Sequence, residues 1–275
     1  MKRLVMAAGL LAIAANAEAQ EQRNPLDASF IVDAGYFFLS TDMRVRVNGE
    51  TKQDTEGSDV NYDDTFGIGD FDRFRVDGLW RFADRHSIEA TYFQNNRSAS
   101  RSIDKDIEFK GELYPVGADV AAQSNLAIAE VSYQYAFMRR ENYEIAAGLG
   151  VYYLDLKLKL DATVAVNGQT NTRNLDTSAS TQAPLPVIGV RGTWRLPHNM
   201  YIDAHAQYLY IDYDPYKGRL VDLKASFVWQ CTDHVGIGIG YDDFRFRFDI
   251  ADRPRFDGTL KWNYGGALAF ATVMF

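Results

Sequence analysis

The residues whose types and spacing could support chemistry are few and widely separated. Asp203 and His205 form an Asp-x-His pair, in which a carboxylate can orient an imidazole for acid–base catalysis. His86 stands next to Ser87, which pairs a base with a hydroxyl group. The sequence does not otherwise place a nucleophile and a base where they would converge on one site. We therefore predict no catalytic residue and interpret Asp203 and His205 as a hydrogen-bonded pair inside the protein.

The histidines and the single cysteine do not indicate a metal site. The four histidines all lie close to expected short turns: His86, His198, His205 and His234. Metal ligands must converge within about 2 Å of one ion, and this spacing does not show such convergence. Cys231 cannot form an intramolecular disulfide, because it is the only cysteine in the chain. We expect no metal and no cofactor.

An acidic segment between residues 49 and 72 partly resembles a calcium-binding loop. Asp59, Asn61 and Asp63 stand at alternate positions. The sixth position carries Asp64 where a calcium loop requires glycine, and the closing glutamate is absent. We therefore expect a solvated acidic loop, with a weak divalent-ion role at a lipopolysaccharide surface as the alternative.

Charged residues recur on one face of the alternating segments described below. They are Arg73, Arg75, Asp77, Arg81, Glu89, Glu130, Glu144, Arg191, Arg195, Asp203, His205, Asp222 and Lys224. Both signs are present, and an unpaired buried charge costs several kcal/mol. This favours pairing across a narrow interior, in which the inward arginines can reach Glu89, Glu130 and Glu144. A polar channel lining is the alternative interpretation.

Strands of alternating polarity must position these charges. Between residues 71 and 93, Phe74 and Trp80 share one face, whereas Arg73 and Asp77 share the other. This period of two predicts two long strands joined by a tight turn. A repeated hairpin with an apolar outside, a polar inside and aromatic ends is typical of a membrane β-barrel.

The same pattern recurs along the chain and predicts ten strands. They cover residues 28–47, 71–82, 86–93, 127–137, 143–151, 188–195, 202–210, 221–230, 235–248 and 259–275. Tight turns are expected at 83–85, 139–142, 197–199 and 231–233, and long loops at 49–72, 95–123 and 161–182. The second loop should contain a hairpin turned near Gly111 or Pro115. In the last strand, Phe275 shares a face with the small residues Ala267, Ala269 and Ala271, whereas Leu268 and Phe270 lie on the other face. A bulge near the end of this strand would explain why Phe275 does not share the face of Leu268 and Phe270.

Aromatic residues flank the expected short turns and the chain end. They are Trp80, Phe82, Phe137, Tyr143, Trp194, Trp229 and Phe275. Amphipathic rings favour the level of the lipid headgroups. We interpret these residues as one membrane-interface belt, with the short turns in the periplasm and the long loops outside.

The first residues predict export from the cytoplasm. Lys2 and Arg3 precede an apolar run that is too short to span a bilayer, since spanning needs about 20 residues. Ala17-Glu18-Ala19 provides a small-x-small cleavage site. Residues 1–19 therefore form a predicted signal peptide, and residues 20–275 one barrel domain. The net charge of -8 argues against a nucleic-acid partner, which would favour a basic surface.

These features together resemble small bacterial outer-membrane β-barrel proteins, the broad OmpA-, OmpX- and OmpW-like group. The segment DDTFGIGDFDRFRVDGLWRF (63–82) resembles the first outer loop and second strand of OmpW-like barrels, and the final Phe275, with Val273 two residues before it, resembles the signal read by the barrel-assembly machinery. The resemblance implies an all-β, transmembrane, antiparallel up-and-down barrel in the bacterial outer membrane, in contact with outer-membrane lipid and lipopolysaccharide. Those families have eight strands, so their functions are not carried over.

We expect a monomeric, non-enzymatic barrel whose loops make surface contacts, with narrow passage of small solutes as a further role. The alternatives are an outer-membrane barrel enzyme acting on lipid or peptide and a soluble lipocalin-like barrel. Ten-stranded proteases of the omptin type also use an Asp-x-His pair. Their site faces outside, however, whereas Asp203 and His205 follow the turn at 197–199.

Overall fold

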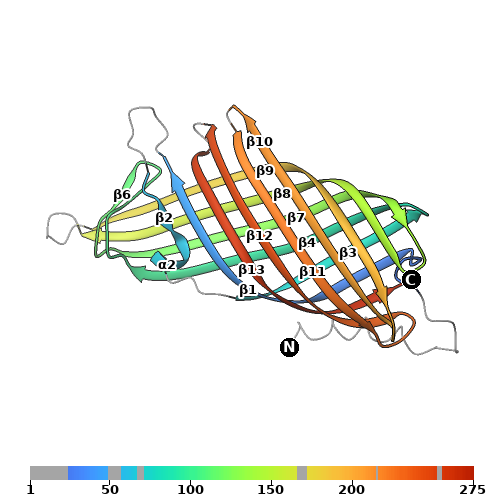
Figure 1. Cartoon of the computed structure of the whole chain (residues 1–275). Helices are drawn as coiled ribbons and strands as arrows, with labels where there is room; N and C mark the ends of the chain where they lie inside the picture. The colour runs from blue at the N-terminus through green and yellow to red at the C-terminus, as the bar shows by residue number, and fades with distance from the viewer. Residues whose placement is uncertain (1–23, 49–56, 67–70, 166–171, 215, 253–255) are drawn as a thin grey trace.

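Ten long antiparallel strands form a closed barrel in the computed structural model, which describes residues 24–48, 57–66, 71–165, 172–214, 216–252 and 256–275 (Figure 1). The strands are β1 (Phe30–Val47), β3 (Phe71–Ala83), β4 (His86–Ser102), β7 (Asp119–Arg139), β8 (Tyr143–Ala165), β9 (Thr172–Leu196), β10 (Met200–Tyr213), β11 (Tyr216–Gln230), β12 (Val235–Asp252) and β13 (Phe256–Met274). Pairing of β1 with β13, from Ile31–Met274 to Val47–Gly258, closes the ring. The expected up-and-down barrel is confirmed, whereas the predicted signal peptide (1–19) lies outside the described residues.

The barrel has a turn end and a loop end. Short turns join β3 to β4, β7 to β8, β9 to β10 and β11 to β12 at the turn end, where the C-terminus also lies (Figure 1). The loop end carries the short strands β2 (Val60–Asn61), β5 (Ile107–Phe109) and β6 (Glu112–Tyr114) and the helix α2 (Tyr62–Phe66). Among the described residues, no helix is long and apolar enough to cross a membrane.

Two of the expected long loops consist mostly of strand. β4 and β7 stay paired from His86–Tyr135 to Ser102–Asp119, and β8 and β9 from Tyr143–Trp194 to Ala165–Thr172. The loops predicted at 95–123 and 161–182 are therefore too long. The hairpin predicted within the first of them is present as β5–β6, and it turns at Lys110 and Gly111, both with positive φ.

The long strands reverse their apolar face partway along their length. In β8 the outward residues are apolar up to Val151 and Tyr153, and then become charged at Asp155 and Lys157. Over the same charged stretch, Leu154, Leu156, Leu158 and Leu160 are buried inside. The pairing of β7 with β8 continues through this point without a register shift. The reversal marks where the apolar surroundings change from outside the barrel to inside it, so it marks the border of the lipid.

The same reversal occurs on the opposite side of the barrel. In β12, Ile237, Ile239 and Tyr241 are exposed, whereas Phe244 and Phe246 are buried. An exposed apolar belt therefore surrounds the half of the barrel nearest the turn end, and a packed apolar core fills the half nearest the loop end. A bilayer core of about 30 Å accounts for the outer belt.

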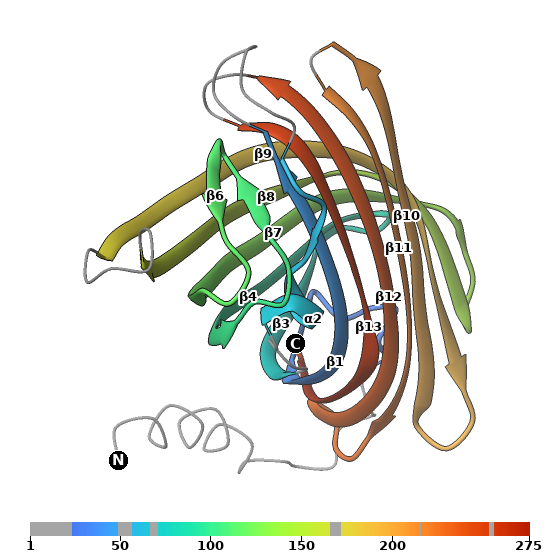
Figure 2. The same ribbon diagram turned by 90° about the vertical axis from the view of Figure 1, so that its left-hand side faces the viewer.

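The ladder between β9 and β10 stops before either strand ends. Its last pair is Tyr208 with Ile188, although β9 continues towards the loop end for another sixteen residues. Pro184 and Pro186 follow Ile188 in this direction, and proline cannot donate a backbone hydrogen bond to a ladder. The two strands separate here, and β9 continues towards β6 while β10 follows β11 (Figure 2).

The last strand contains no bulge, which corrects the expectation from the sequence. β13 pairs in continuous register with both β1 and β12. Leu268 is buried and Phe270 is half-buried on the inside, where glycines on the neighbouring strands make room for the Phe270 ring. A Cβ atom at Gly238 would lie 2.3 Å from Phe270 Cζ, and one at Gly35 would lie 2.5 Å from Phe270 Cβ.

Candidate functional site

Charged and polar side chains fill the barrel interior at the level of the apolar belt. Asp222 and Lys224, for example, are buried on either side of the exposed Leu223. The buried charged set comprises Arg75, Arg81, Glu89, Glu130, Glu144, Arg191, His205, Asp222, Lys224 and Asp242, with Asp33, Asp77 and Asp203 half-buried. We call these residues the polar plug.

Asp77 is the centre of one part of the polar plug. It accepts hydrogen bonds from Arg75 Nη2 at 3.0 Å and Thr91 Oγ1 at 2.7 Å, and Lys224 Nζ lies 3.2 Å away. Arg75 also contacts Asp242, so one guanidinium group joins two carboxylates. These residues come from β3, β4, β11 and β12, so the contacts cross the lumen.

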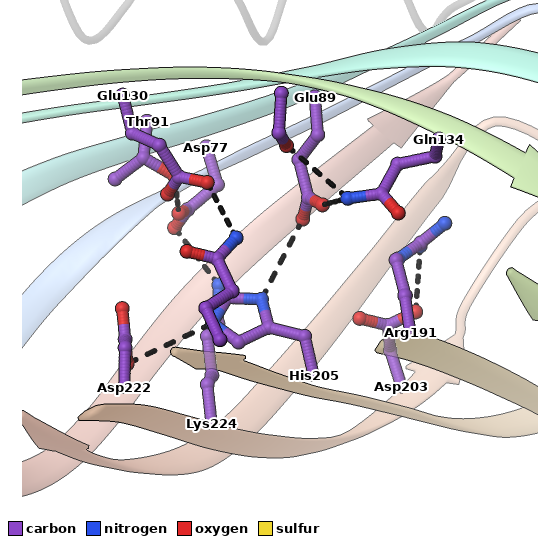
Figure 3. Close-up of polar contacts among 12 residues, drawn as sticks. Asp77, Glu89, Thr91, Glu130, Gln134, Arg191, Asp203, His205, Asp222 and Lys224 are labelled. Atoms are coloured by element: carbon purple, nitrogen blue, oxygen red, sulfur yellow. Dashed lines mark hydrogen bonds and ion pairs between the residues drawn. The ribbon is translucent and has the colours of Figure 1, made fainter. Parts of the chain in front are cut away.

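His205 occupies the second part of the polar plug, between two carboxylates (Figure 3). His205 Nδ1 lies 3.7 Å from Glu89 Oε1, and Nε2 lies 3.8 Å from Asp222 Oδ1. Tyr152 Oη donates a hydrogen bond of 2.5 Å to Asp222 Oδ2. Glu130 accepts a hydrogen bond of 2.5 Å from Gln207 Nε2. Among the residues that the structure describes, Glu130 therefore meets a neutral amide, and no arginine forms an ion pair with it.

Two further ion pairs lie towards the turn end. Arg81 donates to both oxygens of Glu144, and Arg191 Nη2 lies 2.6 Å from Asp203 Oδ2. Asp203 and His205 therefore have different partners, which corrects their interpretation as a hydrogen-bonded pair. His205 lies in the lumen, on the same face as the other inward charges.

The remaining space inside the polar plug is small. One cavity beside Asp33 and Lys224 has a volume of about 30 Å³, and another beside Arg75 has about 10 Å³. A space of this size holds one or two water molecules at most. Neither of these two cavities has the width of a passage for hydrated ions.

An aromatic layer covers the polar plug on its loop-end side. Phe244 stacks on Tyr264 with ring centroids 4.7 Å apart, and Trp262 lies 4.8 Å from the same ring. Phe37 meets Tyr264 edge-on at 5.6 Å and receives Arg75 over its face at 5.8 Å. All these aromatic side chains are buried. On β12, the inward side chain changes from the charged Asp242 to the apolar Phe244 at the next inward position, so the lumen changes from ionic to apolar over a short distance.

Helix α2 packs within the ring of strands at the loop end, against β1, β4 and β7 (Figure 2). Tyr62 and Phe66 are buried, with their rings 4.9 Å apart. Asp63 accepts a hydrogen bond of 2.8 Å from the Met43 backbone and pairs with the buried Arg97. Burial raises the pKa of Asp63 above its ordinary value, although Arg97 favours the charged carboxylate. This segment of the first loop is anchored inside the barrel, which corrects the expectation of a fully solvated loop.

Two predicted lumen residues lie elsewhere or cannot be described. Arg195 is exposed at the turn end, where it lines a shallow cavity together with Arg139 and Asp84. The side chain of Arg73 lies outside the described part of the structure. Sequence reasoning did not select Asp242, Tyr152 or Gln207, although each lies inward by the same alternation that selected the others.

The predicted interface aromatics lie on the outer wall. Trp80, Phe82, Phe137, Trp194, Trp229 and Phe275 are exposed, and Tyr143 is half-buried. Phe30 stacks on Trp80, with ring centroids 6.0 Å apart. Their placement in the headgroup layer stays a prediction.

The polar plug has the groups for acid–base chemistry but lacks access for a substrate. His205 is 6% exposed and has carboxylates on both sides. The described residues contain no group of three or more histidine, cysteine or acidic side chains arranged to hold a metal ion. Cys231 is exposed at a turn. The arrangement is suited to holding the strands together across the lumen.

Solved outer-membrane barrels have a similar fold. The outer-membrane protease OmpT from Escherichia coli matches with a TM-score of 0.58 and 11% identity, over 94% of this chain and 100% of that chain. The toluene transporter TodX from Pseudomonas putida matches with a TM-score of 0.37 and 8% identity, over 90% of this chain and 89% of that chain. The attachment invasion locus protein Ail of Yersinia pestis matches with a TM-score of 0.34 and 11% identity, over 90% of this chain and 97% of that chain.

At these sequence identities, the similarity shows a shared fold and does not show a shared function. No protein-family model matches the chain, and no curated protein matches it. The closed barrel, its exposed apolar belt and the fold of OmpT define an integral β-barrel protein of the bacterial outer membrane.

Proposed function

We propose that this protein is a monomeric, non-enzymatic outer-membrane barrel with a sealed lumen, which acts through contacts at its loop end. The observation that carries the proposal is that two successive zones of buried side chains fill the lumen. Buried charged side chains occupy the membrane-spanning half of the lumen, and a packed aromatic and aliphatic core occupies the half above it.

The sealed lumen predicts little ion flow. Buried ion pairs are disrupted only at a cost of several kcal/mol, because each charge loses its partner. Purified protein in a planar bilayer should therefore show no steady open-pore conductance at moderate voltage. A stable ohmic conductance in the wild-type protein would favour narrow passage of small solutes and would contradict the sealed lumen.

The β5–β6 hairpin supports a contact role at the loop end. Its inner residues Ile107, Phe109 and Tyr114 are buried, and Tyr114 Oη donates a hydrogen bond of 3.0 Å to the Leu160 carbonyl in β8. Leu113 and Val116 are instead 55% and 59% exposed. They lie beyond the reversal of the apolar face, so lipid does not cover them. An anchored hairpin with exposed apolar side chains is suited to contact with another molecule.

This contact role can be tested on intact cells. Cells that carry Leu113→Ser and Val116→Ser should lose adhesion or self-aggregation that the wild-type protein confers. The exposed Ser178 on β9 offers a control position, as Ser178→Ala. Unchanged cell behaviour with normal surface levels would contradict the contact role of the hairpin.

The alternative of a barrel enzyme acting on lipid or peptide has weaker support. Its best candidate base, His205, lies beneath the aromatic layer and is almost fully buried. Purified protein should release no product from peptide or phospholipid substrates. Hydrolysis that His205→Ala abolishes, while the fold is retained, would overturn this part of the proposal.

A further inference from the structure

A row of four cations crosses four neighbouring strands on the outer wall of the barrel. Arg44 in β1 lies opposite Lys261 in β13, Lys261 opposite Arg247 in β12, and Arg247 opposite Arg219 in β11. The residues that alternate with them, among them Val45, Trp262, Phe246 and Leu220, are buried inside. The four cations therefore project outward, and we call them the basic row.

The protein itself balances this charge only in part. Like charges directly opposite one another on paired strands are destabilising. Arg44 lies 3.5 Å from Asp42 and Arg247 lies 3.3 Å from Asp249, but all four side chains are solvent-exposed, and such pairs contribute little. Within the described residues, no carboxylate forms an ion pair with Arg219 or Lys261. In a chain with a net charge of -8, a row of this kind indicates an external anion.

A surface cavity of about 420 Å³ lies along the basic row. Arg219, Arg247 and Lys261 line it together with Arg245 and Asn263, and Val221 and Leu223 provide apolar lining. The cavity therefore presents cationic and apolar groups to one ligand. This combination fits an amphiphile that has an anionic group next to its hydrocarbon portion.

The basic row lies directly above the lipid-facing belt. On β12 the exposed Tyr241 precedes Asp243, Arg245 and Arg247, and on β11 the exposed Leu223 is followed towards the loop end by Val221 and Arg219. Lipid headgroups meet the barrel at this level, because the apolar face reverses here. The phosphates of outer-leaflet lipid are the anions expected at this height.

We propose that the basic row and its cavity bind the phosphate groups of lipopolysaccharide, with the acyl chains packed on Val221, Leu223 and Tyr241. The inference rests on the outer-membrane location and is independent of the proposed contact role and of the sealed lumen. Arginine is suited to this role, since its planar guanidinium group binds phosphate through paired hydrogen bonds.

The wall formed by β8 and β9 offers an internal control at the same height. Lys157 lies 3.9 Å from Asp155, and Lys159 lies 2.9 Å from Asp161 and 3.4 Å from Asp176. Each of these lysines has a carboxylate partner on the protein, whereas Arg219 and Lys261 form no ion pair among the described residues. Their replacement should leave phosphate binding unchanged.

Binding can be measured in nanodiscs of phosphatidylcholine that contain diphosphoryl lipid A or a lipid A without phosphates. The variant Arg219→Gln, Arg247→Gln and Lys261→Gln should bind diphosphoryl lipid A on the order of 100-fold more weakly, since each cation near an anionic lipid contributes about one fivefold step. Lys157→Gln with Lys159→Gln should bind like the wild type. High salt should weaken wild-type binding.

Three outcomes would overturn the proposal. They are equal affinity of the triple variant, equal binding of the lipid without phosphates, and full occupation of the site by millimolar inorganic phosphate in detergent. If the triple variant does not fold, the single variants Arg219→Gln and Lys261→Gln replace it. Each single variant should bind diphosphoryl lipid A about fivefold more weakly than the wild type. Wild-type affinity in both single variants would equally overturn it.

Discussion

Arg81 and Glu144 form a two-point ion pair across the turn end of the lumen. Arg81 Nη1 donates to Glu144 Oε2 at 2.8 Å, and Nη2 donates to Oε1 at 3.1 Å. The side chains are 7% and 3% exposed. β3 and β8, which carry them, are separated in the sheet by β4 and β7. The pair therefore joins strands that share no backbone hydrogen bonds.

Loss of one partner of this pair should destabilise the barrel. Glu144→Gln should lower the free energy of unfolding by about 3 kcal/mol, because Arg81 keeps its charge inside the lumen. The double variant Arg81→Met with Glu144→Met should cost less, since an apolar pair leaves no buried charge. Urea unfolding in vesicles measures both, with the exposed Glu141→Gln as control. A double variant as unstable as the sum of the single variants would contradict this account.

Asp77 should contribute more to closure of the lumen than Glu130. Asp77→Ala removes a shared partner of Arg75 and Lys224 and should cost about 3–5 kcal/mol. Glu130→Ala removes a hydrogen bond to the neutral Gln207 and should cost no more than about 2 kcal/mol. Planar-bilayer recordings should show a leak in the Asp77 variant. The leak should favour cations, because carboxylates outnumber arginine and lysine in the polar plug.

The two variants must differ for this explanation to stand. Equal leaks from Asp77→Ala and Glu130→Ala would show that closure does not depend on the contacts around Asp77. A wild-type protein that already conducts, with only its ion selectivity changed by these variants, would show that the lumen is water-filled.

Phe66 should hold the first loop against the barrel interior. Phe66→Ala removes a buried ring, a change that typically costs about 3–5 kcal/mol. The loss should appear as faster hydrogen exchange in residues 57–66 and only a small change in global unfolding, because α2 adds no strand to the ring. The half-buried Thr65, as Thr65→Ala, provides a control in the same helix. Unchanged exchange in the Phe66 variant would mean that Asp63 and Arg97 alone anchor the segment.

The side chain of Phe275 should matter for assembly in cells more than for the folded barrel. Backbone groups of Phe275 exchange hydrogen bonds of 2.8 and 3.1 Å with Phe30, and alanine keeps both. Phe275→Ala should therefore refold into vesicles at a nearly wild-type rate but accumulate poorly in the outer membrane. Pulse-labelling of cells and refolding of purified protein measure the two rates. An equal fall in both would assign Phe275 a structural role alone.

The alternation of polar and apolar residues correctly predicted the membrane-spanning half of each strand, because outward residues are apolar and inward residues polar in every strand there. Outward positions meet lipid, so Ile237, Ile239 and Tyr241 show the period directly. The extended halves were missed because the rule reverses above the lipid. The segment 161–182, rich in asparagine, threonine and serine, was interpreted as a loop. Residues 161–165 belong to β8 and residues 172–182 to β9, and in β9 the buried Leu175 and Ala179 alternate with polar residues, so the apolar face of this strand points inward.

The sequence predicted which residues of the candidate site point inward, but not which of them interact with one another. The face of a strand follows from residue parity, and parity placed Asp77, Glu89 and Lys224 inside. The residue that lies opposite depends on the tilt and shear of the closed barrel, which a single sequence does not reveal. This explains why Glu130 meets Gln207 rather than an arginine, and why His205 meets Glu89 rather than Asp203.

The unequal strand lengths give the protein a tall side and a short side. β9 has 25 residues and β10 has 14, whereas a tilted strand crosses the bilayer core in about ten. At about 3.3 Å per residue and a tilt of about 40°, the surplus of β9 rises roughly 35 Å above the lipid. This height is comparable to the hydrocarbon core itself. A large partner could therefore dock on the tall side without descending to the headgroups, and it would approach the barrel obliquely over the short side.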